Sequence, residues 1–238
     1  MIRKVVVLAG GKGTRMGNLT ADRPKHLIPV NGRPFIYYLL NNLLKAGLTE
    51  IFLMVGYKKE CWNDFLKTLD IKVKLIDQTE RVNGKYGSAC PVEAAEPEVS
   101  GENFIAINGD NLYSIEDIKA ISQDDQLNYV AGYHHEDPTK YGVLISDSGG
   151  YLKEIKEKSP KPITNLINSG LYKFTPRYFD EVKKIELSPR GEYEITDVIT
   201  RLAKQRLVKV YELKDYWYDF GKPDDIDKVS KFLKTQTS

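Results

Sequence analysis

The chain has 238 residues, 41% of them hydrophobic and 29% charged, and a formal net charge of +2. This length and composition are typical of a soluble globular protein with a large core. The small net charge, with lysines and arginines spread along the chain, gives no reason to expect a nucleic-acid partner, and no apolar run approaches the roughly 20 residues of a membrane span.

The first half of the chain alternates predicted strands and helices. Residues Lys4–Leu8 are a short β-branched run, typical of a buried strand, and a signal peptide would have a longer apolar region. Apolar residues then recur at helical spacing between Pro34 and Gly47. Further strands are predicted over 51–55, 73–76 and 104–107, and further helices over 58–69 and 88–95. This order predicts right-handed crossovers and an α/β fold, with a Rossmann-like, doubly wound, mainly parallel mixed sheet.

The second half is predicted to contain more strands and fewer helices. Strands are expected over 129–133, 143–145, 152–155, 166–174 and 207–212, followed by an extended segment at 217–220. Helices are expected over 176–185, over 195–205 and from Pro223 onward. No linker rich in Gly, Ser or Pro separates the halves, so the sequence predicts a single domain over 1–238.

Two groups of metal-binding residue types do not predict a transition-metal site. Cys61 and Cys90 lack metal-ligand spacing and are expected to be buried free thiols in a reducing cytoplasm. His134 and His135 are adjacent, so in a strand they would point to opposite faces and could not share one ion. The sequence therefore predicts a cytoplasmic protein with reduced cysteines.

A glycine-rich loop follows the first strand, over residues 8–17. In an open parallel sheet ligands bind beyond the carboxyl ends of the strands, and glycines there let backbone N–H groups approach phosphate oxygens. The loop lacks the Walker spacing because Gly13 follows Lys12, and it has one residue too many for the dinucleotide fingerprint. A second block, Arg-Pro-Lys-His-Leu-Ile-Pro, follows at 23–29.

Together the two blocks resemble those of the sugar-1-phosphate nucleotidyltransferases, glucose-1-phosphate uridylyltransferases and thymidylyltransferases among them, which carry G-G-x-G-T-R followed by R-P-K-x-L-x-P. The resemblance implies that Arg15 contacts a nucleoside triphosphate and Lys25 the phosphates at the reacting centre, where both would neutralise charge. It also assigns to the nucleotide Leu8, Ala9, Gly10, Gly11, Gly13 and Thr14. His26 stands where many members have proline and is given no catalytic role.

Two carboxylates complete the implied catalytic set. Asp110 follows the predicted strand 104–107 and also touches the nucleotide in this interpretation. By itself an aspartate at a strand end is more often a turn residue. The block at 217–223, however, resembles the family's W-x-D-x-G-x-P, which supplies a second metal ligand at Asp219. The resemblance thus implies Mg²⁺ held by Asp110 and Asp219, with Arg15, Lys25 and Asp110 as the catalytic residues.

Four later blocks resemble the family's sugar-phosphate-binding segments, in the same order. They are Y-G-V at 141–143, E-K-S-P at 157–160, N-S-G-L-Y at 168–172 and R-G-E-Y-E-I-T-D at 190–197. Ser159 is an insertion relative to the family's E-K-P. The residues implied to bind the sugar phosphate are Gly142, Glu157, Lys158, Asn168, Gly170 and Arg190.

The base is expected near Gln78, Gly87 and Ser88. A glutamine amide can both donate to and accept from the Watson–Crick edge of uracil or thymine. A methyl group contributes only about 1–3 kcal/mol in a fitted pocket, so UTP and dTTP both stay open.

The resemblance implies transfer of a nucleotidyl group from UTP or dTTP to a sugar 1-phosphate, with glucose 1-phosphate preferred, by in-line attack that releases pyrophosphate. Residues 1–125 would mainly bind the nucleotide and residues 126–238 the sugar phosphate. No membrane partner is expected, a homo-oligomer stays open, and the absence of hexapeptide repeats predicts no fused acyltransferase. The rivals are cytidylyl or guanylyl transfer to mannose 1-phosphate or phosphocholine, and a catalytically silent nucleotide-sensing subunit.

Overall fold

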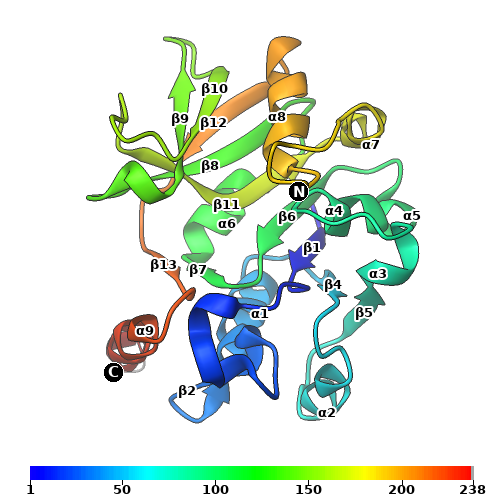
Figure 1. Cartoon of the computed structure of the whole chain (residues 1–238), viewed down its shortest axis with the longest axis vertical. Coiled ribbons are helices and arrows are strands. Elements are labelled where there is room, and N and C mark those ends of the chain that lie inside the picture. The colour runs from blue at the N-terminus through cyan, green and yellow to red at the C-terminus, as the bar shows by residue number, and fades with distance from the viewer. Residues whose placement is uncertain (237–238) are drawn as a thin grey trace.

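The computed structural model describes residues 1–236, and a nine-stranded mixed sheet organises them (Figure 1). The main path of this sheet runs through β10 (Leu152–Glu157), β9 (Gly142–Ser146), β11 (Leu166–Phe174), β6 (Phe104–Asn108), β1 (Lys4–Leu8), β4 (Glu50–Val55) and β5 (Val73–Asp77). Off this path, β8 (Asn128–His134) pairs with β11 and with β12 (Val208–Glu212). Strands β6, β1, β4 and β5 are parallel to one another, which confirms the predicted α/β fold.

Two apolar cores lie on the two faces of the sheet, because alternate side chains of each buried strand point in opposite directions. Val5 and Val7 of β1 join one core, while Val6 joins the other. The first core is covered by α1 (Phe35–Lys45), α2 (Cys61–Lys67) and α6 (Ile115–Ile121). The second is covered by α4 (Cys90–Ala94), α5 (Glu96–Val99), α7 (Arg177–Val182) and α8 (Ile195–Lys204).

Most predicted strands agree with the observed ones, but several short elements were not predicted. The helix expected over 58–69 begins only at Cys61, because Lys58 has a left-handed backbone with φ +52°. The helix expected over 176–185 is confined to α7. The unpredicted elements are α3 (Gln78–Arg81), α5, α6, the strands β2 (Pro29–Val30), β3 (Arg33–Pro34) and β7 (Asn111–Tyr113), and the 3-10 helices η1 (Thr14–Thr20), η2 (Lys25–Leu27) and η3 (Pro138–Lys140).

A small ribbon, separate from the main sheet, brings distant parts of the chain together. In it β7 pairs in antiparallel fashion with β13 (Trp217–Asp219), so that Asp219 lies opposite Asn111. The Phe220 N–H also donates to the Asp110 carbonyl. The chain then continues into α9 (Asp224–Gln236), next to a second small ribbon made of β2 (Pro29–Val30) and β3 (Arg33–Pro34). The β7–β13 ribbon therefore places the residues that follow Asp110 beside the residues that precede Phe220.

The cysteines and the histidine pair follow the predictions only in part: β8 ends at His134, so the prediction of opposite strand faces does not apply to His135. Cys90 is buried, which raises the pKa of its thiol to about 11, whereas Cys61 is only partly buried, contrary to the prediction. His134 contacts Asn165 and Glu212, while His135 stacks near Tyr141. Within residues 1–236 no helix is both long and apolar enough to cross a bilayer.

Candidate active site

The glycine-rich loop leaves the carboxyl end of β1 in a conformation that depends on its small residues. Gly13 has a φ of +65° and precedes η1, and a side chain added there would meet Lys25 at 3.0 Å. A Cβ at Gly10 would lie 2.5 Å from the Gln78 Oε1 atom, so the Gln78 side chain occupies the space that this glycine leaves open. The loop thereby places Lys25 and Gln78 close to its own backbone.

Two adjoining cavities open beside this loop. The first, of about 440 Å³ and here called the loop cavity, is lined by Leu8, Gly10, Gly11, Arg15, Lys25, His26, Gln78, Tyr86, Gly87, Ser88, Pro91, Asn108, Asp110 and Glu192. The second, of about 690 Å³ and here called the ribbon cavity, is lined by Thr14, Arg15, Tyr86, Asn108, Asp110, Asn111, Lys140, Tyr141, Lys158, Asn168, Ser169, Glu192, Trp217 and Asp219. Five residues line both cavities, which therefore form one continuous cleft at the carboxyl ends of β1 and β6: Arg15, Tyr86, Asn108, Asp110 and Glu192.

Two side chains that line the loop cavity have a buried polar atom without a hydrogen-bond partner within residues 1–236, Gln78 at Oε1 and His26 at Nδ1. The Ser88 hydroxyl, by contrast, accepts from the Ile195 N–H at 2.9 Å and donates to Glu194 at 3.2 Å. Because a buried acceptor without a partner is costly, the Gln78 Oε1 atom is suited to accept from an N–H group of a ligand. The Ser88 hydroxyl is already engaged, so only the Ser88 backbone could contact a ligand.

The centre of the cleft holds two carboxylates and two cationic side chains. The Lys25 ammonium donates to Asp110. Burial opposes the ionisation of Asp110, but the positive charge of Lys25 holds its pKa below the ordinary value. Burial and the neighbouring Asp110 charge raise the pKa of Asp219 to about 6. The charge of Asp110 thus disfavours ionisation of Asp219, and a further cation beside them would favour the charged form of both.

Asp110 and Asp219 provide the oxygen donors that a hard divalent cation prefers. Asp219 accepts a hydrogen bond of 3.2 Å from the Asn111 amide, which orients one of its oxygens. A side chain at Gly221 would lie 3.0 Å from the Arg15 guanidinium and 3.2 Å from Asp219, so this glycine leaves room for the arginine beside the carboxylate. No group of three or more His, Cys, Asp or Glu residues suited to a metal gathers anywhere in residues 1–236. A cation held by this pair would therefore complete its coordination with ligand oxygens or water.

The predicted sugar-phosphate residues divide into two groups. Lys158 and Asn168 line the ribbon cavity. Gly142 and Glu157 lie against each other in the β9–β10 pairing, since a Cβ at Gly142 would be 2.8 Å from the Glu157 carboxylate. Arg190 is joined to Glu194 by an ion pair of 2.8 Å. The predicted residues that line neither cavity are Ala9, Gly13, Gly142, Glu157, Gly170 and Arg190.

Sequence reasoning missed several residues of the cleft. Tyr86, Asn108 and Glu192 line both cavities but were not among the predicted site residues. Asn108 stands two residues before Asp110, and Glu192 lies in the Arg-Gly-Glu block, so position relative to the motifs was an available signal. The same signal was available for Tyr86, which lies on the exposed loop between α3 and α4 and directly precedes the predicted Gly87 and Ser88.

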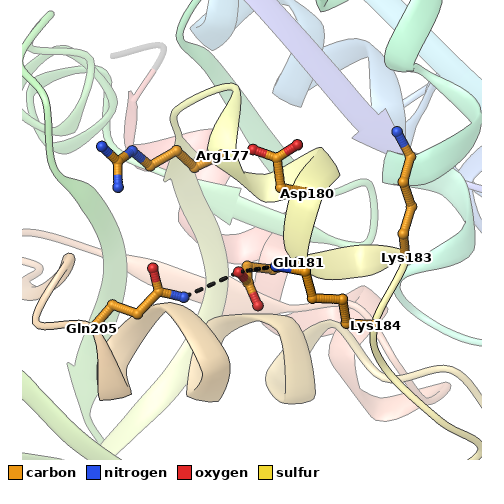
Figure 2. Close-up of a pocket in the computed structure, with 6 residues that line it drawn as sticks. All are labelled: Arg177, Asp180, Glu181, Lys183, Lys184 and Gln205. Carbon is orange, nitrogen blue, oxygen red and sulfur yellow. Dashed lines mark hydrogen bonds and ion pairs between the residues drawn. The ribbon is translucent and has the colours of Figure 1, made fainter.

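A further hollow of about 440 Å³ lies between α7 and α8, and its chemistry differs from that of the cleft (Figure 2). Glu181 is at its centre and accepts hydrogen bonds from Lys184, Arg201 and Gln205, at 2.8, 2.7 and 3.1 Å. Its carboxylate is thus neutralised within the fold. Within residues 1–236, the lining of this hollow includes neither a glycine-rich loop nor a buried polar atom that lacks a hydrogen-bond partner. The cleft is therefore the better candidate.

The fold and this cleft define an α/β protein with a ligand-sized cleft at the carboxyl ends of its parallel strands, and comparisons with known proteins identify its family. Residues 4–236 match the Nucleotidyl transferase family, and the chain belongs to it. Members of this family generally depend on a divalent metal.

Named relatives agree with this assignment. The bifunctional protein GlmU of Methanococcus aeolicus is 37% identical over 230 residues, which cover 96% of this chain and 54% of GlmU. The UTP–glucose-1-phosphate uridylyltransferase AglF of Haloferax volcanii is 29% identical over 242 residues, covering 99% of this chain and 98% of AglF. A solved structure from Bacillus anthracis, described as a candidate glucose-1-phosphate thymidylyltransferase, superposes with a TM-score of 0.82 at 25% identity, covering 96% of this chain and 94% of that one. The chain thus spans about half the length of GlmU and nearly all of AglF.

Proposed function

We propose that this protein transfers a nucleotidyl group from UTP or dTTP to a sugar 1-phosphate, glucose 1-phosphate foremost, and releases pyrophosphate. The observation that carries the proposal is the meeting of Arg15, Lys25, Asp110 and Asp219 at the centre of the cleft, where the loop and ribbon cavities adjoin. Positive charge and a metal site at one point suit a reaction that depends on positioning and charge neutralisation. The name of AglF, which the chain matches over nearly its whole length, supports UTP and glucose 1-phosphate.

In the proposed reaction, an oxygen of the sugar phosphate forms a bond to the α-phosphorus of the nucleotide. The bond from that phosphorus to the bridging oxygen breaks, and pyrophosphate leaves with the electron pair. The sugar phosphate is already an anion near neutral pH, so no general base is needed. Arg15 and Lys25 would neutralise the triphosphate, while Lys158 and Arg190 would orient the attacking phosphate.

Mg²⁺ held by Asp110 and Asp219 would supply further charge neutralisation at the phosphates. Lys25, whose ammonium forms an ion pair with Asp110 in this structure, would lie beside such a metal. Its positive charge would be available to a phosphate oxygen there. The carboxylate pair thus suits a cation, and Lys25 suits a phosphate.

The proposed division of labour along the chain follows the two cavities. Residues 1–125 supply most of the loop cavity, where Gln78 would accept from the N3–H of uracil or thymine. Residues 126–238 supply Lys158 and Asn168 of the ribbon cavity, where the sugar phosphate would lie. A cytoplasmic location belongs to this proposal, because Cys61 and Cys90 are free thiols.

The proposal is tested by incubating the protein with a nucleoside triphosphate, a sugar 1-phosphate and Mg²⁺ and measuring pyrophosphate. Release is expected with UTP or dTTP and glucose 1-phosphate, and the panel should include CTP and GTP with mannose 1-phosphate and phosphocholine. Absence of release with every pair would refute the proposed function.

A second measurement tests the metal assignment alone. Asp110→Asn removes one charged oxygen donor from the carboxylate pair and is expected to lower kcat at least about 100-fold, the usual effect of removing a transition-state charge partner. Asp70→Asn, at an exposed position away from both cavities, is the matched control and should keep the wild-type rate. An Asp110→Asn variant with full activity would exclude Asp110 as a metal ligand.

A further inference from the structure

Asn108 occupies the junction of the two cavities. It is the last residue of β6, two residues before Asp110, and it pairs in register with Leu8 at the end of β1. Like Arg15 and Asp110, it lines both the loop cavity and the ribbon cavity. A molecule that extends from the loop cavity into the ribbon cavity therefore lies beside the five residues that they share, Asn108 among them.

Space for the Asn108 amide is made by a glycine on the neighbouring strand. Gly170 of β11 has a φ of +83°, and a Cβ there would lie 2.2 Å from the Asn108 Nδ2 atom. No side chain could be accommodated at that distance. Gly170, which was predicted as a sugar-phosphate residue, lines neither cavity and instead leaves room for this amide. The side chain of Asn108 is thus held beside β11 by the shape of the backbone.

The Asn108 amide has hydrogen-bonding capacity that the fold does not use. Two other asparagines of the ribbon cavity are already engaged, because Asn111 donates to Asp219 and Asn168 accepts from the Gly170 N–H. None of the hydrogen bonds within residues 1–236 involves the side-chain amide of Asn108. An amide offers an acceptor oxygen next to a donor nitrogen, and in a half-buried site both gain from a ligand that matches them.

We propose that Asn108 recognises the hydroxyl edge of the nucleotide's ribose and so makes the enzyme prefer ribonucleotides to deoxyribonucleotides. The inference rests on the proposed function, in which the base lies at Gln78 and the triphosphate at Arg15, Lys25 and Asp110. The ribose joins these two parts and must lie between them, where Asn108 lines the cleft. A vicinal diol presents a donor beside an acceptor, which complements the acceptor and donor of an amide. A 2′-deoxyribose keeps only one of the two hydroxyls.

The experiment compares UTP with dUTP, because this pair differs only in the 2′-hydroxyl, whereas dTTP also adds a methyl group. Wild-type protein is expected to show a kcat/KM roughly tenfold higher with UTP, the effect of about one net hydrogen bond. Asn108→Leu keeps a similar branched shape without the amide. It should bring the ratio close to one, mainly through a slower reaction with UTP.

Glu192→Gln is the matched control, since Glu192 also lines both cavities but has no role in the proposed contacts to the base or the triphosphate. This variant should keep the UTP preference whatever its absolute rate. Equal wild-type rates with UTP and dUTP, an unchanged ratio in Asn108→Leu, or loss of the preference in Glu192→Gln would each overturn the inference. Asn108→Ala replaces the leucine variant if the latter does not fold, as judged by circular dichroism.

Failure of this inference can be distinguished from failure of the proposed function. If no nucleotide and sugar phosphate give pyrophosphate, the proposed function fails, and calorimetric titration of the whole protein with UTP and dUTP then tests Asn108 alone. Tighter binding of UTP that is lost in Asn108→Leu would support the ribose contact. Equal binding of both nucleotides would overturn it.

Discussion

Gly10 illustrates how a single missing side chain shapes the candidate site. Its backbone lies so close to the Gln78 amide that a Cβ would come within 2.5 Å of Oε1 and 2.8 Å of Nε2. Gly11 next to it has open space on that side, since a Cβ added there would meet nothing within 4 Å. A side chain is therefore excluded by Gln78 at Gly10 but not at Gly11. Only Gly10 contacts the side chain that is proposed to bind the base.

Gly10→Ala should therefore weaken nucleotide binding by displacing Gln78. We expect a KM for UTP raised about tenfold or more, because the base loses a hydrogen bond and the cavity changes shape. Gly11→Ala is the control and should have a much smaller effect on that constant. Steady-state kinetics with varied UTP measures both, and equal effects of the two substitutions would argue against the role of Gln78.

At the scale of secondary-structure elements, α6 secures the β7–β13 ribbon on which the carboxylate pair depends. The Ser114 hydroxyl caps α6 by accepting from the Asp117 N–H at 3.1 Å. The buried Asp117 carboxylate accepts from the N–H groups of Lys214 and Asp215, at 2.9 and 3.0 Å, and from the Tyr211 hydroxyl at 3.0 Å. These bonds fix the chain just before β13, and hence the approach of Asp219 to Asp110.

Asp117→Ala is expected to lower the free energy of unfolding by about 2–4 kcal/mol, since it leaves buried donors without partners. Urea denaturation monitored by tryptophan fluorescence measures this loss. Glu116→Ala, on the exposed face of the same helix, should change the free energy of unfolding by less than about 0.5 kcal/mol. A similar effect of both substitutions would mean that α6 does not depend on the Asp117 contacts.

At the scale of the whole molecule, stability near neutral pH depends partly on carboxylates that are paired inside the fold. Glu181, between α7 and α8, is the clearest example (Figure 2). Its hydrogen bond from Lys184, with those from Arg201 and Gln205, lowers its pKa to about 2, against an ordinary value of 4.5. A lowered carboxyl pKa in the folded state stabilises the protein above the unfolded-state pKa, and the contribution is lost as the pH falls toward the folded-state pKa.

Glu181→Gln should therefore destabilise the protein by about 2 kcal/mol at pH 7, as expected for hydrogen bonds to a charged group. This difference from wild type should shrink between pH 4.5 and about 2, the window set by the two pKa values. Thermal unfolding at a series of pH values measures it, with the exposed Glu186→Gln as control. A difference that stays constant over that window would show that packing, and not charge, accounts for the effect.

Local patterns in the sequence were sufficient for much of the fold and for the centre of the candidate site. Buried strands such as β1 and β6 were predicted because their hydrophobic runs reflect burial on both faces of a parallel sheet. Arg15 and Lys25 were predicted because each lies within a motif of fixed spacing. The four-residue α3 was not, since its sequence Gln-Thr-Glu-Arg has no apolar residue to set a helical period. The helix α6 does carry isoleucines at helical spacing, and this signal was overlooked.

The tertiary structure alone decided which distant residues share a surface. The family resemblance implied that Asp110 and Asp219 hold one metal, but their proximity depends on the β7–β13 pairing across more than 100 residues of chain. Asn108 is an ordinary strand residue in the sequence, and only Gly170 on the neighbouring strand β11 shows that its amide has been given room. Motifs record chemistry that is local in the chain, whereas a cleft is assembled from the ends of strands that only the sheet brings together.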